Sequence, residues 1–138
     1  MCLGMAVNDK LRFVMLSLTD TVSSLYKLME DEKYLRTRLG ADKWKSLIEN
    51  SSLQIHECKE GFNLQRVKFC ETCSRVRLGM TGDEWANCKS PDSFIGFGGQ
   101  GSSTCGTPTP ELVSCGNLVR CRDHEDKEIR AFGYIFVR

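Results

Sequence analysis

The sequence predicts an α+β fold in which an N-terminal amphipathic helix, or a helix pair, is followed by a small cysteine-rich antiparallel β domain. Three observations predict it. Apolar residues recur in steps of three and four from Leu11 to Leu39, as in a helix. Runs with a period of two begin at Leu53, as in strands. Seven of the eight cysteines lie between Cys58 and Cys121, so we expect a helical segment at 1–50 and a cross-linked β domain at 51–138.

The helical segment carries the stripe of a heptad repeat, with Asp9 placed to cap its start and Gly40 to end it. A second short helix is expected from Asp42 to Glu49, with Trp44, Leu47 and Ile48 on one face. The stripe of the first helix is formed by Leu11, Val14, Leu18, Thr21, Leu25, Leu28, Leu35 and Leu39.

Two interpretations of this stripe remain open. In one, the helix packs on the sheet of its own β domain, which suits a stripe that Met15, Val22 and Met29 widen beyond a two-stranded seam. In the other, residues 11–39 form a short coiled coil and make the protein a homo-oligomer.

The β domain is expected from several short strands separated by Gly- and Pro-containing turns. The strongest strand signal is the last one, because residues 129–137 are rich in β-branched and aromatic side chains. Both faces of this strand are apolar, so we expect it in the middle of the sheet, covered on both sides. The expected strands are 53–56, 64–69, 74–78, 93–97, 118–120 and 129–137.

The cysteines allow two interpretations. A disulfide framework would use Cys58, Cys70, Cys73, Cys88, Cys105, Cys115 and Cys121, with Cys2 as an eighth member. Alternatively, the C-x2-C pair Cys70/Cys73 and the C-x2-H pair Cys121/His124 supply four ligands to a structural zinc ion. We favour disulfides because zinc leaves Cys88, Cys105 and Cys115 without a role.

A Gly- and Ser-rich loop suggests a recognition surface. Loops on rigid scaffolds often carry binding residues, and the candidates here are Trp85, Phe97, Gln100, Ser102 and Ser103. Residues 96–101 also match G-x-G-x-x-G, but a helix-poor segment follows them, so no dinucleotide site is predicted.

The composition and charge of the chain argue against several classes of function. The net charge of +1 argues against nucleic-acid binding, and no apolar run is long enough to span a membrane. No motif names a reaction, so we expect no catalytic residues, no cofactor and no enzyme. The favoured function is an extracellular recognition or adhesion module that binds a protein or glycan, provided that an export signal is missing from this chain. The alternative is an intracellular, zinc-stabilised interaction adaptor.

Overall fold

The computed structural model describes residues 1–18, 23–30, 32–64, 73–101, 114–121 and 126–137. Within these ranges the chain is mostly β. The strands are β1 (Cys2–Val7), β2 (Lys10–Met15), β3 (His56–Phe62), β4 (Arg75–Asp83), β5 (Ser93–Gln100), β6 (Cys115–Val119), β7 (Lys127–Arg130) and β8 (Phe132–Phe136), and the helices are α1 (Leu25–Glu30) and α2 (Ala41–Lys45).

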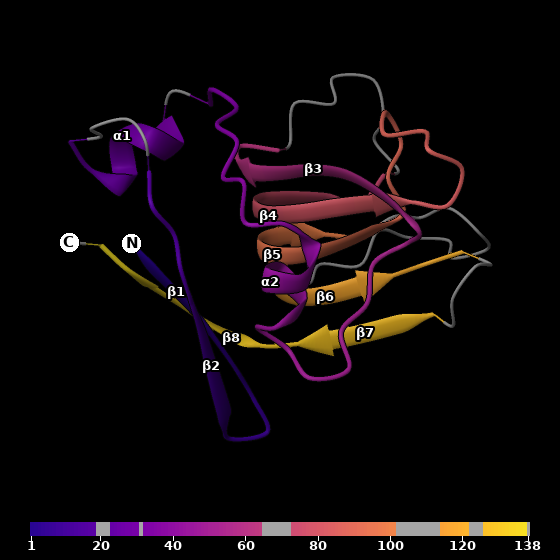
Figure 1. Cartoon of the computed structure of the whole chain (residues 1–138), viewed down its shortest axis with the longest axis horizontal. Coiled ribbons are helices and arrows are strands. Elements are labelled where there is room, and N and C mark those ends of the chain that lie inside the picture. The colour runs from indigo at the N-terminus through magenta and orange to yellow at the C-terminus, as the bar shows by residue number, and fades with distance from the viewer. Residues whose placement is uncertain (19–22, 31, 65–72, 102–113, 122–125, 138) are drawn as a thin grey trace.

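The strands form two antiparallel sheets that share the C-terminal stretch of chain. The five-stranded sheet has the order β3-β4-β5-β6-β7, and the three-stranded sheet has the order β2-β1-β8. Figure 1 shows β7 running directly into β8, so that one stretch of chain leaves the larger sheet and enters the smaller one. The first and last strands are therefore neighbours, with Cys2 opposite Phe136.

The prediction of an N-terminal amphipathic helix or coiled coil was wrong. Residues 2–15 form the β1–β2 hairpin, and the only helix in the described part of the 11–39 stretch is the six-residue α1. Asn8 and Asp9 make the two-residue turn with φ of 48° and 62°. Positive φ at both central residues fits the right-handed twist of a hairpin, and Asn and Asp tolerate it best among residues with a side chain. Asp9 is thus a turn residue instead of a helix cap.

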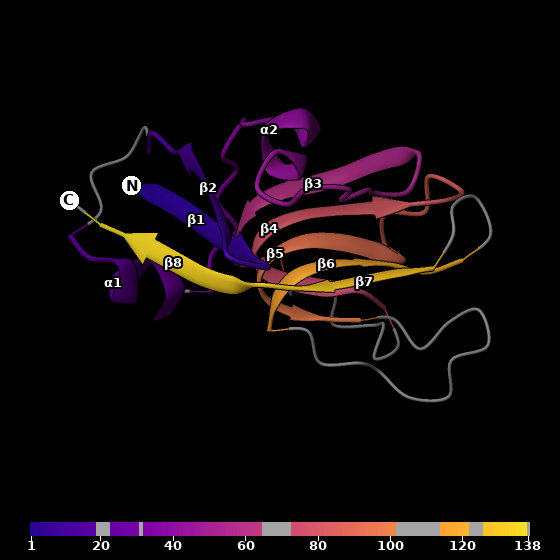
Figure 2. The ribbon, with the colours of Figure 1, turned by 90° about the horizontal axis from the view of Figure 1, so that it is seen from below.

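One hydrophobic core joins residues on both sides of position 50. The inward faces of β1 and β2 contribute Leu3, Met5 and Val14, and these belong to the same buried cluster as side chains of α2, β3, β4 and β5. As predicted, Trp44, Leu47 and Ile48 all face this core, although the helix is shorter than expected and ends at Lys45. In Figure 2, α2 lies over one face of the five-stranded sheet. A second, smaller cluster comprises Leu64, Val76, Phe94 and Leu118.

The prediction of β-rich structure in the second half is confirmed, but the final strand is not where we expected it. Strands cover most of the expected segments at 74–78, 93–97, 118–120 and 129–137, whereas residues 53–55 lie outside any strand and most of 64–69 lies outside the described residues. The last segment is divided at Ala131 into β7 and β8, and each half is the terminal strand of its sheet. Phe132, Tyr134 and Phe136 are exposed, because they lie on the face of the three-stranded sheet opposite the buried Leu3 and Met5.

A buried carboxylate, that of Glu60 in β3, anchors α2 to the larger sheet. One Glu60 oxygen accepts hydrogen bonds from the Gly40 amide and from the Trp44 indole Nε1, each 2.9 Å long. The Arg36 guanidinium lies 4.0 Å from the other oxygen. Because a buried indole N–H without an acceptor is costly, Glu60 fixes how Trp44 sits in the core.

We predict that Glu60→Ala lowers the free energy of unfolding by about 1–3 kcal/mol, since it leaves buried donors unpaired. The measurement is urea denaturation followed by tryptophan fluorescence. Glu57→Ala is the matched control, because Glu57 lies on the same strand but is exposed, and it should change stability little. Equal effects of the two substitutions would contradict this role for Glu60.

Candidate functional site

The exposed face of the three-stranded sheet is lined with apolar and aromatic residues. Strand register places Gly4 between Phe13 of β2 and Tyr134 of β8, and the pairs on either side follow the same alternation. We call this surface the aromatic face. It consists of Cys2, Gly4 and Ala6 from β1, Leu11, Phe13 and Met15 from β2, and Phe132, Tyr134 and Phe136 from β8.

The large side chains of the aromatic face are open to solvent. The six residues contributed by β2 and β8 are 42 to 79% exposed, and Phe132 is the most exposed. Single exposed apolar residues are common, but monomeric proteins rarely expose a contiguous group of this kind. This group is therefore the candidate binding surface of the chain.

Aromatic rings contact one another across this face. The ring centroids of Phe13 and Phe136 lie 6.2 Å apart, and those of Tyr134 and Phe136 lie 6.3 Å apart with nearly parallel planes. Gly4 makes the first contact possible, because a Cβ atom at this position would lie 2.5 Å from the Phe13 ring. The Phe13 ring can therefore lean over the central strand, and the face forms a continuous surface.

Charged residues of the hairpin belong to its opposite face. Lys10 and Arg12 alternate with the residues of the aromatic face, and both pair with Glu49, at 2.9 and 3.5 Å. The hydrogen bond from Lys10 lowers the pKa of the exposed Glu49 carboxyl. The aromatic face itself contains no charged residue.

Among the described residues, the structure does not bring the predicted recognition residues together. Trp85 follows β4 next to the Gly82–Ser93 pair, whereas Gln100 pairs with Arg75 at the opposite end of the β4–β5 ladder. Gln100 accepts a hydrogen bond from the Arg75 guanidinium, and Phe97 is buried. Ser102 and Ser103 lie outside the described residues.

Trp85 nevertheless sits on a well-anchored loop. The Asp83 carboxylate accepts hydrogen bonds from the backbone amides of Trp85 and Asn87, at 2.9 and 2.6 Å. A disulfide between Cys58 and Cys88 ties the same loop to β3. The Trp85 side chain is 80% exposed, so this isolated aromatic residue is a matched control for the residues of the aromatic face.

The cysteines fall into two groups among the described residues. Cys58 and Cys88 form a disulfide, and Cys73 and Cys121 are also disulfide-bonded. Cys2 and Cys115 are free thiols, although Cys115 was among the predicted disulfide candidates and Cys2 was included as an eighth member. Cys70, Cys105 and His124 lie outside the described residues. The zinc interpretation needs thiolates at Cys73 and Cys121, which their oxidised sulfurs do not provide.

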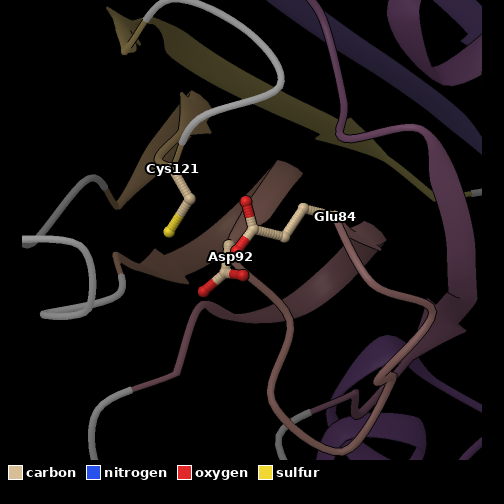
Figure 3. A group of neighbouring side chains, drawn as sticks. All are labelled: Glu84, Asp92 and Cys121. Atoms are coloured by element: carbon tan, nitrogen blue, oxygen red, sulfur yellow. The ribbon is translucent and has the colours of Figure 1, made fainter.

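A group of possible metal ligands lies near the ends of β4 and β6. Figure 3 shows the Glu84 and Asp92 carboxylates beside the sulfur of Cys121, and their ligand atoms are within 4.8 Å of one another. The Cys121 sulfur is already bonded in a disulfide, so two carboxylates remain, and we assign no metal to them.

The chain matches no protein-family model, no curated protein and no solved structure. No helix in the described ranges is long and apolar enough to cross a membrane. Function must therefore be inferred from the chain's own surface.

The pattern in the sequence that could have located this surface lies at its N-terminus. Asn8-Asp9 separates two apolar runs, which is a hairpin signal. Leu11, Phe13 and Met15 alternate with Lys10, Arg12 and Val14, so β2 can be recognised as a two-faced strand once the turn is recognised.

We predict that alkylation will distinguish the two cysteine groups. Under denaturing, non-reducing conditions, mass spectrometry should find adducts at Cys2 and Cys115 and none at Cys58, Cys73, Cys88 or Cys121. In native, dilute protein, Cys115 should react slowly because burial raises its pKa to about 12. Only the thiolate is nucleophilic, so this rate should rise steadily with pH across the alkaline range. Native alkylation at Cys58 or Cys88 would contradict the assignment.

Proposed function

We propose that this chain is a non-enzymatic extracellular recognition module that binds protein through the aromatic face. The observation that carries the proposal is the exposure of the six large apolar residues that β2 and β8 place on this face. Aromatic residues and Met are enriched, and charged residues depleted, at the centres of protein interfaces. The composition of the aromatic face follows this pattern.

The chemistry of the aromatic face favours a protein ligand over a glycan. A sugar presents many hydroxyl groups, and each one that loses water needs a hydrogen-bonding partner. Among the nine residues of the aromatic face, only Tyr134 carries a hydroxyl and only Cys2 a thiol. An apolar protein surface is the better complement, because it loses no hydrogen bonds on contact.

The disulfides support an oxidising compartment. The Cys58–Cys88 disulfide closes a loop with a sequence separation of 30, and Cys73 and Cys121 are oxidised as well. Several structural disulfides in one small chain are typical of secreted proteins and rare in the cytosol. A disulfide that closes a loop of this length is worth about 3–4 kcal/mol, so a reducing compartment would weaken the fold.

Site-specific photo-crosslinking tests the proposal. The photo-reactive residue benzoylphenylalanine is introduced in place of Phe132, and the chain is illuminated in its extracellular fluid or in the medium of cells that produce it. We predict a discrete covalent adduct with a protein. The same probe in place of Trp85 is the matched control, since the two side chains are 79 and 80% exposed. An adduct from position 132 and none from position 85 supports the proposal. No adduct from position 132, or an equal yield of the same products from both positions, contradicts it.

A further inference from the structure

We infer that the protein bound by the aromatic face is a second copy of this chain, so that two three-stranded sheets pack face to face around a twofold axis. This inference rests on the proposed function and names the partner. Three properties of the aromatic face support it, namely its area, its lack of charge and the alternation of large and small side chains across it.

The exposed area is what a stable dimer needs. Side chains of this size present about 150–250 Å² when fully exposed, so the observed exposed fractions correspond to roughly 650 Å² of apolar surface per chain. Complete burial of this surface on two copies would remove at most about 1,300 Å² from water, which lies near the lower end of the range of specific interfaces. Homodimer interfaces are also the most apolar class.

The distribution of charge permits self-pairing. A twofold axis brings a surface against its own copy, so any charge near the axis meets a like charge. The aromatic face avoids this repulsion because all nine of its residues are uncharged. The nearest cations of the hairpin, Lys10 and Arg12, lie on the reverse face and are paired with Glu49.

The different sizes of the side chains on the aromatic face allow two copies to interdigitate. Large side chains on β2 and β8 flank the smaller Cys2 and Ala6 on the central strand, which are only partly exposed. Sheets that pack face to face lie about 10 Å apart with side chains meshed between them. Large residues of one copy can therefore fill the low positions of the other.

Sedimentation velocity of the oxidised full chain tests the inference directly. We expect a monomer–dimer equilibrium between about 1 and 100 µM. Phe132→Lys on β8 and Met15→Lys on β2 should each weaken dimerisation by about tenfold or more, since each brings an unpaired charge into the interface. Trp85→Lys removes an equally exposed aromatic residue elsewhere and should leave the dimerisation constant unchanged.

Three results would overturn the inference. They are a wild-type chain that is monomeric throughout this concentration range, a dimer that survives both lysine substitutions, or an equal loss of dimerisation affinity on Trp85→Lys. Because a variant can fail to fold, the alkylation rate of Cys2 in the wild-type chain is a second readout. Cys2 lies on the aromatic face, so its rate should fall several-fold as protein concentration rises. A rate independent of concentration would overturn the inference.

The crosslinking experiment separates this inference from the proposed function. An adduct that joins residue 132 of one copy to a second copy of this chain supports both the dimer and the proposed function. A monomer that crosslinks from residue 132 to a different protein overturns the dimer and leaves the proposed function standing. A monomer without an adduct at this position overturns both.

Discussion

The pairing of β8 with β1 is the constraint on which the rest of this structure depends. Only Ala131 separates β7, in the larger sheet, from β8, in the smaller one, so a single stretch of chain belongs to both. The Ala131 amide donates a hydrogen bond of 2.9 Å to the Cys115 carbonyl. Gly133 passes so close to β6 that a Cβ atom there would lie 2.7 Å from the Cys115 sulfur. These contacts fix where β8 leaves the larger sheet, and β8 in turn positions the hairpin.

The aromatic face is a consequence of this pairing. Successive side chains of a strand point to opposite faces, so a register that buries Leu3 and Met5 must expose the row that contains Gly4. Exchanging the two rows would move Leu3 and Met5 into water. This would cost about 1.5–3 kcal/mol of folding free energy for each side chain. The aromatic residues therefore point outward because Leu3 and Met5 point into the core from the same sheet. An exposed surface of this composition is a liability for an isolated chain, and a bound partner would remove that liability.

The sequence predicted part of this structure for physical reasons that can be identified. Local signals were sufficient where neighbours along the chain decide the structure, as for the strands near Val76 and Ile95 and for the buried side of Trp44. They failed in the hairpin, because Leu11, Val14 and Leu18 fit a helical stripe equally well while strand pairing is decided by distant partners. The alternation of Phe132, Tyr134 and Phe136 was visible in the sequence. That these rings are exposed was not, because it depends on which face of β8 is turned away from the core, and only the long-range pairing with β1 determines this.

The most direct test of this architecture is the register between β1 and β8 in solution. Cross-strand nuclear Overhauser effects measured on the oxidised protein should connect Cys2 with Phe136, Gly4 with Tyr134 and Ala6 with Phe132. This pattern would place the three aromatic rings on the face opposite Leu3 and Met5. A register shifted by one residue would turn those rings toward the core, and the absence of contacts between the two strands would remove the three-stranded sheet. Either result would contradict the assignment of the aromatic face as a binding surface.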